Sequence, residues 1–197
     1  MAYKSFNHLT IRNQGNIVTQ IHKLIKSYVD FFVMRERVYI KNLAKIDGSI
    51  YWISVTNNEL LAMALLEPEH NFELEGVSFK TLGHIIARKP GVIDRVIRHI
   101  WEDNKNDNII AFSKPRLAHA ILDSNEKIVE FNALDLATRW PSMGNRITSY
   151  FNIRNEKTMQ AMLRKDQHLY IKFTIDTIEK FKKTNLDLYN FIQENIK

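Results

Sequence analysis

The stretch from Tyr51 to Trp101 constrains the fold more than any other part of the chain. Runs rich in Ile, Val and Leu predict successive β-strands at 50–56, 60–66 and 77–88. Asn57-Asn58 is a turn signal of the kind that joins the two strands of a hairpin. The 60–66 run is almost wholly apolar, which is typical of a central strand buried on both faces. We therefore expect a protein built around a β-sheet.

The third of these runs ends in a basic turn, Arg88-Lys89-Pro90-Gly91, which opens an amphipathic helix. Apolar residues recur at helical spacing after the turn: Val92, Ile93, Val96, Ile97, Ile100 and Trp101. A strand that leads through a basic, glycine-containing turn into a helix can hold a phosphate, because backbone N–H groups and the helix dipole favour an anion there. A cofactor or substrate that carries phosphate is the first hypothesis.

Other elements surround this block. Periodicity and turn residues predict further strands at 6–12, 109–112, 129–134, 147–153 and 168–173, and helices at 17–44, 117–122 and 175–196, the last with a weak point at Thr184-Asn185. We predict an α/β (α+β) fold with a mixed central sheet flanked by helices and an extra C-terminal helix. One domain is expected over residues 1–197, with a core at about 6–134 and a C-terminal extension at about 135–197.

Composition excludes several classes of function. The chain has no cysteine, which excludes disulfides, a thiolate nucleophile and a Cys-ligated metal. Its seven histidines show no metal-binding spacing, so no metal site is expected. The chain has no apolar run long enough to span a membrane and no secretory signal, and we expect a cytoplasmic protein. The net charge of +6 favours an anionic partner, although lysine-rich surfaces are also common.

The order of these elements resembles the Gcn5-related N-acetyltransferase (GNAT) fold. The resemblance covers roughly residues 6–134, about two thirds of the chain, and rests on order and spacing. In that family the motif Arg/Gln-x-x-Gly-x-Gly/Ala starts the helix after the fourth strand, and its backbone N–H groups bind the pyrophosphate of acetyl-CoA. Here Arg88 and Gly91 match the motif, whereas Ile93 stands in place of its last small residue and Pro90 removes one N–H.

The resemblance implies an acyl-CoA-dependent N-acyltransferase, with acetyl-CoA or another acyl-CoA as cofactor and an unknown amine as acceptor. It implies that the cofactor lies along Ile85, Ile86, Ala87, Arg88, Lys89, Gly91, Val92 and Ile93, with Ser113 within reach. His84 is the candidate base, unless it is an ordinary sheet residue with a satisfied hydrogen bond. Glu67 and Glu69 could play the same role. Many family members place a Tyr on the helix after the fifth strand. Residues 115–122 contain none, and His119 is the candidate substitute.

The alternative is a non-catalytic relative that keeps the fold and binds nucleic acid or a protein partner. Basic residues lie beside aromatic ones at Arg139-Trp140 and in the segment 146–154. Such mixtures can stack bases and contact phosphates, but these aromatic residues can equally be core or half-buried strand residues. The C-terminal helix can pack on the sheet or form a contact between two copies in a homodimer.

Overall fold

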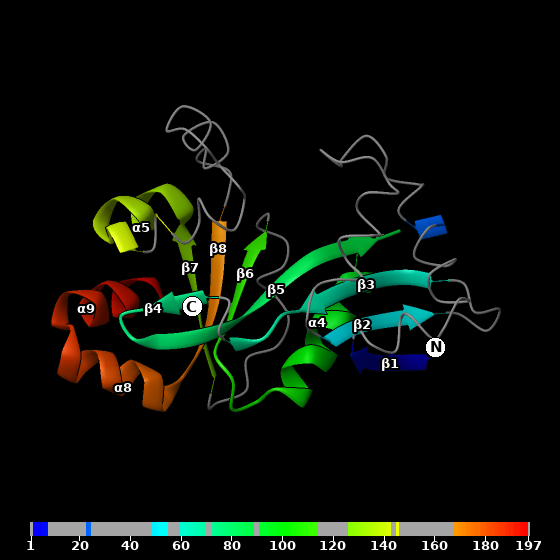
Figure 1. Cartoon of the computed structure of the whole chain (residues 1–197), viewed down its shortest axis with the longest axis horizontal. Coiled ribbons are helices and arrows are strands. Elements are labelled where there is room, and N and C mark those ends of the chain that lie inside the picture. The colour runs from blue at the N-terminus through cyan, green and yellow to red at the C-terminus, as the bar shows by residue number, and fades with distance from the viewer. Residues whose placement is uncertain are drawn as a thin grey trace. The chain divides into compact units, whose positions relative to one another are not determined.

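The computed structural model in Figure 1 describes residues 2–7, 23–24, 49–54, 60–69, 72–88, 91–113, 126–142, 145 and 168–196. The chain divides into two compact units, one of residues 1–68 and 82–104 and the other of residues 69–81 and 105–197. Strand β5 (Val77–Ala87) is shared, since its first half belongs to the second unit and its second half to the first. Hydrogen-bonded neighbours follow the order β1-β2-β3-β5-β6-β8-β7, and β4 pairs with β5 beside this order.

The first unit contains an antiparallel set of strands. β1 (Ala2–Asn7) pairs with β2 (Ser49–Ser54), β2 with β3 (Leu60–Leu66), and β3 with the end of β5. The apolar run predicted as a central strand is β3, and it is buried along its length except at half-buried Leu61. β1 starts earlier than predicted, and residues 8–12 lie outside the described part of the chain. So does most of the helix predicted at 17–44, of which only Lys23 and Leu24 are described, both helical.

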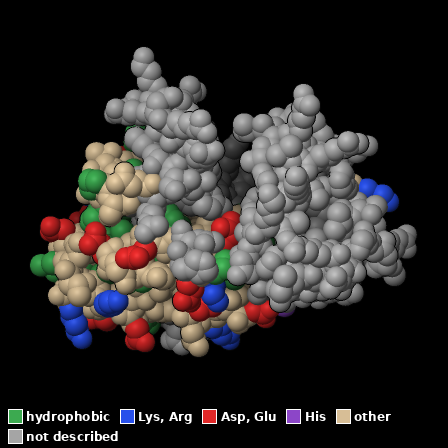
Figure 2. Space-filling model, in the orientation of Figure 1, with side chains coloured by type: hydrophobic (Ala, Val, Ile, Leu, Met, Phe, Trp, Pro, Cys, Tyr) green, Lys and Arg blue, Asp and Glu red, His purple; other side chains and the backbone are tan. Residues whose placement is uncertain are grey.

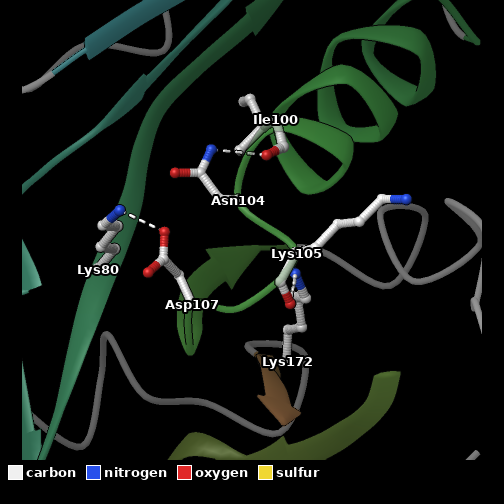
Figure 3. A network of polar contacts seen from close by, with 6 residues as sticks. All are labelled: Lys80, Ile100, Asn104, Lys105, Asp107 and Lys172. Atoms are coloured by element: carbon white, nitrogen blue, oxygen red, sulfur yellow. Dashed lines mark hydrogen bonds and ion pairs between the residues drawn. The ribbon is translucent and has the colours of Figure 1, made fainter. Parts of the chain in front are cut away.

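Helix α4 (Val92–Asp103) follows β5 and confirms the predicted amphipathic helix. It packs on β2 and β3 with Val96, Ile97, Ile100 and Trp101 buried, while Arg95 and Arg98 are exposed. Asn104 ends the helix: its backbone N–H donates to the Ile100 carbonyl at 3.0 Å, and its side-chain Nδ2 donates to the same oxygen at 2.7 Å. Figure 3 shows the side-chain contact. A single residue, Asn104, therefore caps the C-terminus of α4.

The second unit contains the start of β5 together with β4 (Phe72–Leu74), β6 (Ile109–Ser113), β7 (Glu126–Asn132) and β8 (His168–Thr174). β8 pairs antiparallel with both β6 and β7. β4 was not predicted, because three residues are too few to show a periodic pattern. It pairs antiparallel with β5 across Glu75-Gly76, whose φ angles of 48° and 74° are typical of a tight hairpin turn.

Three described helices cover the second unit. Helix α5 (Ala133–Arg139) corrects the strand predicted at 129–134, because Asn132 ends β7 and its Oδ1 accepts hydrogen bonds from the N–H groups of Leu134 and Asp135 at 3.0 and 3.2 Å. The break predicted in the C-terminal helix is confirmed at Asn185, which separates α8 (Ile175–Thr184) from α9 (Leu186–Asn195). The helix predicted at 117–122 and the strand predicted at 147–153 lie outside the described residues.

An apolar core holds the second unit together. Aromatic rings of β4, β5, β8 and α8 meet edge to face in this core, with centroids 6.5 Å apart for Phe72–Phe79, 5.6 Å for Phe79–Phe173 and 5.8 Å for Phe173–Phe181. Leu169 and Ile171 of β8 belong to the same cluster. The architecture is thus a mixed α+β fold with a mostly antiparallel sheet and flanking helices, which confirms the predicted fold class.

Candidate functional site

A β-bulge marks the end of β5, at the position of the predicted catalytic residue. Leu65 pairs with Gly83 and Met63 pairs with Ile86, so β5 advances by one residue more than β3 between these two pairs. The extra residue lies at His84-Ile85, opposite Ala64. Bulges bend a strand and redirect its backbone groups, and they are frequent next to functional sites. The bulge therefore gives this part of β5 a local geometry that a regular strand does not have.

Beyond the bulge, the backbone N–H groups of β5 point alternately to the two sides of the strand. The N–H of Arg88 donates to the carbonyl of Leu61 in β3 at 2.8 Å. Since successive N–H groups of a strand point to opposite sides, the N–H of Ala87 points away from β3. Ile86 is buried, whereas Ile85, Ala87 and Arg88 are half-buried. The segment thus has a backbone donor on the side away from β3 just before the turn into α4.

Gly91 is the N-cap residue of α4 and adopts a left-handed conformation, with φ 78° and ψ −14°. Gly91 has no side chain that could cap the helix. It is exposed, and a Cβ added to it would meet nothing within 4 Å. The first N–H groups of a helix have no intrahelical acceptor, so those at the start of α4 point out of its N-terminus. Asp94 also lies in the first turn, where the positive N-terminal end of the helix dipole stabilises a carboxylate.

These features fit a phosphate group at the start of α4. The open space around Gly91, the exposed helix N-terminus and the guanidinium of Arg88 supply room, N–H donors and positive charge. Val92 and Ile93 are half-buried in the first turn, and the apolar side chain of Ile93 occupies the position of the family's small residue. Lys89 and Pro90 lie outside the described residues, and the side chain of His84 is likewise not described.

The remaining predicted residues lie elsewhere. Ser113 is the last residue of β6, in the second unit, and pairs with His168 of β8. Glu67 follows β3 and is buried, with 8% of its surface exposed. Glu69 belongs to the second unit and is exposed. The structure therefore places residues 84–88 at the end of β5 and residues 91–93 at the start of α4, the next element along the chain, and it places Ser113 and Glu69 in the other unit.

Glu69 belongs to a polar network before β6. Figure 3 shows the side chains of Lys80 and Asp107 pointing toward each other, and they form an ion pair. Burial, a hydrogen bond with Asp107 and the charge of Asp107 raise the pKa of Glu69 above its ordinary value of 4.5, while Lys80 lowers it. The backbone N–H of Lys80 donates to the Asn108 carbonyl at 3.0 Å. These contacts join β5 to the loop before β6 and are best explained as structural.

The predicted aromatic–basic pair Arg139-Trp140 contacts a helix of its own unit. The ring of Trp140 lies 5.1 Å from that of Phe191 in α9, and the Arg139 guanidinium lies 4.5 Å from the same ring. Trp140 is half-buried. Figure 2 shows acidic and basic side chains interspersed on the described part of the visible face. Both side chains thus have a packing role, which is the alternative that the sequence left open.

Sequence reasoning missed a cluster of ionisable residues in the second unit. Glu130 of β7 accepts a hydrogen bond from the hydroxyl of Tyr170 in β8 at 2.9 Å, and Nδ1 of His168 lies 3.1 Å from the same carboxylate oxygen. His168 and Tyr170 are 38 and 40 residues away from Glu130 along the chain, which is why no local motif indicates the cluster. The available signal was the alternation of His168, Tyr170 and Lys172 within an otherwise apolar strand.

Neither a metal-binding group nor a membrane-spanning helix is present among the described residues. No group of three or more His, Cys, Asp or Glu side chains is placed to hold a metal ion in this part of the chain. The helices that the structure describes are all too short or too polar to cross a membrane.

Comparisons with known proteins give distant structural similarity and no match in sequence. No protein-family model matches the chain, and no curated protein matches it significantly. A solved structure of a conserved protein of unknown function from Enterococcus faecalis V583, described as a probable N-acyltransferase, is 12% identical with a TM-score of 0.43. The similarity covers 68% of this chain and 36% of that one, so the chain spans about a third of that protein's length. A similarity of this degree establishes neither a family nor an activity.

Proposed function

We propose that the protein is an acyl-CoA-dependent N-acyltransferase that uses acetyl-CoA, or another acyl-CoA, to acylate an amine. One observation carries this proposal: the bulge at His84-Ile85 lies near the end of β5, and the next element along the chain, α4, has the left-handed Gly91 as its N-cap. This is the segment that the resemblance to the GNAT family assigns to the cofactor. The order of strands around it supports the same interpretation.

Each part of the segment suits one part of such a cofactor. The N–H groups at the start of α4 and the side chain of Arg88 would hold the pyrophosphate, because helix N-termini favour anions. The backbone of Ile85–Ala87 would align the pantetheine and donate a hydrogen bond to the thioester carbonyl. The bound acyl-CoA supplies a thioester carbon that is open to attack by an amine.

The protein has to position the amine and remove its proton. The amine nitrogen forms a bond to the thioester carbon, the carbon–sulfur bond breaks, and CoA leaves as the thiolate. A base accepts the proton of the attacking amine, and His84 is the predicted residue for this role because neutral imidazole accepts protons near pH 7. Replacement of His84 by Gln should therefore lower kcat and leave acyl-CoA binding unchanged.

Binding is tested first, by thermal unfolding with acetyl-CoA or CoA. A ligand at about 100 times its Kd stabilises the folded protein by roughly 2.7 kcal/mol, which gives a clear rise in Tm. The matched variant is Gly91→Val, whose side chain would fill the open space at the start of α4 and should abolish the rise. The proposal fails if the native protein shows no rise at millimolar acetyl-CoA.

The same protein can be titrated with single- and double-stranded nucleic acid. A steep loss of affinity with increasing salt would support the non-catalytic alternative, to which the net charge of +6 points. Acyl transfer is then measured with a panel of amines and a thiol reagent. Because the chain contains no cysteine, the reagent detects only the CoA that is released. Release that depends on the amine, and that is lost in Gly91→Val, is the expected result.

A further inference from the structure

The polar cluster of the second unit lies on one face of β8. Leu169, Ile171 and Phe173 belong to the apolar core, so the alternate residues His168, Tyr170 and Lys172 lie on the opposite face of the strand. In the register of β7 and β8, Glu130 is the direct partner of Tyr170. Cross-strand partners share a face of the sheet, so the four ionisable side chains lie on the same side.

One hydrogen bond and one ion-pair contact to the same carboxylate oxygen define the geometry of this cluster. A single carboxylate oxygen, Oε1 of Glu130, lies 2.9 Å from the Tyr170 hydroxyl and 3.1 Å from Nδ1 of His168. The side chain of Glu130 is only 13% exposed and Tyr170 is almost fully buried. The His168 side chain is 25% exposed. A shielded carboxylate thus holds one side of the imidazole, while part of the ring remains accessible to solvent.

A proton donor faces the Glu130 carboxylate. Burial raises the pKa of Tyr170, so its hydroxyl keeps its proton and donates to the carboxylate at neutral pH. Lys172, 1% exposed, lies two residues along β8, and its Nζ donates to the Lys105 carbonyl at 3.4 Å, as Figure 3 shows. Ionisable groups are costly to bury, and a buried sheet face usually carries them only where they are paired with other groups or have a functional role.

The contact with Glu130 determines which nitrogen of His168 can react. An imidazole that donates from Nδ1 to a carboxylate has its lone pair on Nε2 when it is neutral. This is the arrangement of a histidine that acts as a general base, with a carboxylate as the positioning residue.

We propose that Glu130, His168 and Tyr170 form a general-base site for a small molecule that carries a hydroxyl or amine. As the nucleophile forms a bond to the acyl carbon of an activated ester, its proton moves to Nε2 of His168, and the imidazolium then returns the proton to the leaving group. His168 is the catalytic residue, Glu130 orients it, and Tyr170 holds Glu130. The site goes beyond the proposed function, because all three residues lie in the second unit and the step requires no CoA.

The chain contains a matched control histidine. His99 of α4 is 27% exposed, close to the value for His168, and it also lies near a carboxylate. Its Nε2 is 3.8 Å from Oδ2 of Asp103, however, which is too long for a hydrogen bond. The variants His168→Gln and His99→Gln therefore remove histidines of similar exposure, whose ring nitrogens lie 3.1 Å from Glu130 and 3.8 Å from Asp103, respectively.

The tautomer of His168 is the first test, and it uses the native protein. Nitrogen-15 NMR at a pH where the ring is neutral should show the proton of His168 on Nδ1, and Glu130→Ala should shift it toward Nε2. A neutral His168 in the native protein with its proton on Nε2 would overturn the proposal, because Nε2 could not then act as the base.

The second test is hydrolysis of nitrophenyl acetate, in which water is the nucleophile and nitrophenolate the leaving group. General-base catalysis contributes about 100-fold or more in rate, so His168→Gln should reduce hydrolysis to the buffer rate while His99→Gln matches the native protein. Glu130→Gln should lower kcat and leave KM unchanged, because it alters the position of the base and not the binding of the ester. Equal rates for the two histidine variants, or a native rate no faster than buffer, would overturn the proposal. Thermal unfolding of each variant verifies that it is folded.

Discussion

At the scale of single residues, the proposed cofactor site depends most on Gly91. Its φ of 78° lies in the left-handed region that glycine adopts without strain. A Cβ at this position would meet nothing within 4 Å, so no neighbouring residue requires glycine here. The requirement for glycine comes from the backbone conformation and from the proposed phosphate ligand. A substitution at Gly91 therefore has two separable effects, one on stability and one on binding.

The effect on stability can be predicted without a ligand. Gly91→Ala should lower the free energy of unfolding by about 1–2 kcal/mol, the cost of the left-handed conformation for an L-residue. Gly91→Asn should lose less, since Asn tolerates this region better. Urea unfolding of the three proteins measures both changes. An alanine variant as stable as the native protein would show that residue 91 does not adopt this conformation.

The raised pKa of the Glu69 carboxyl leads to a second prediction, which concerns the pH dependence of stability. Burial and Asp107 raise its pKa above 4.5, so the folded protein holds this proton more tightly than the unfolded chain does. Its contribution to stability is therefore complete below about pH 4.5 and is lost as the pH rises through the folded pKa. Because the side chain is exposed, we expect a small effect.

Glu69→Gln should remove this part of the pH dependence. The measurement is Tm at a series of pH values on both sides of pH 4.5, with Glu73→Gln of the exposed face of β4 as the matched control. The native protein should lose stability relative to Glu69→Gln as the pH rises. Parallel curves for the native protein and Glu69→Gln would contradict the proposed role of Asp107.

At the scale of elements, asparagine caps determine where α5 and α9 begin. Asn185 accepts a hydrogen bond from the Leu188 N–H at 2.9 Å and separates α8 from α9. The side chain of Asn132 likewise accepts hydrogen bonds from the first turn of α5, and this cap is why the strand predicted at 129–134 ends at Asn132. Apolar periodicity predicted the long elements β3, β5, α4 and α8 well. It could not distinguish strand from helix in the short run around Leu134, where one capping side chain decides.

The cap at Asn185 can be tested directly. Asn185→Ala should lower the free energy of unfolding by about 1 kcal/mol, because the Leu188 N–H loses its acceptor. Asn185→Asp keeps an acceptor at the same position and should match the native protein. Denaturant unfolding measures both values. Equal losses in the two variants would mean that the side-chain hydrogen bond contributes nothing.

At the scale of the whole molecule, each unit combines a local sequence pattern with contacts that the pattern does not reveal. The end of β5 and the start of α4 could be predicted because the two elements follow each other along the chain, whereas the bulge at His84-Ile85 was not predicted. The Glu130–His168–Tyr170 cluster could not, because β7 and β8 bring together residues about 40 positions apart. The core of the second unit likewise depends on rings from β4, β5, β8 and α8.

Removal of one of these rings should destabilise the fold. Phe181 is fully buried, and Phe181→Ala should lower the free energy of unfolding by about 3–5 kcal/mol, because it removes apolar contacts and leaves a cavity. Leu186→Ala is the control, since Leu186 is 58% exposed and its loss should have little effect. Guanidinium unfolding compares them. Similar losses for the two variants would contradict the described packing of α8.

The central claim is that acyl-CoA binds at the end of β5 and the start of α4. Hydrogen–deuterium exchange of the native protein, with and without saturating acetyl-CoA, tests this claim by locating the protected amides. We predict slower exchange in peptides that cover residues 85–93, with the N–H groups at the start of α4 and that of Ala87 among those protected. Unchanged exchange in these peptides at millimolar acetyl-CoA would contradict it, as would protection confined to other parts of the chain.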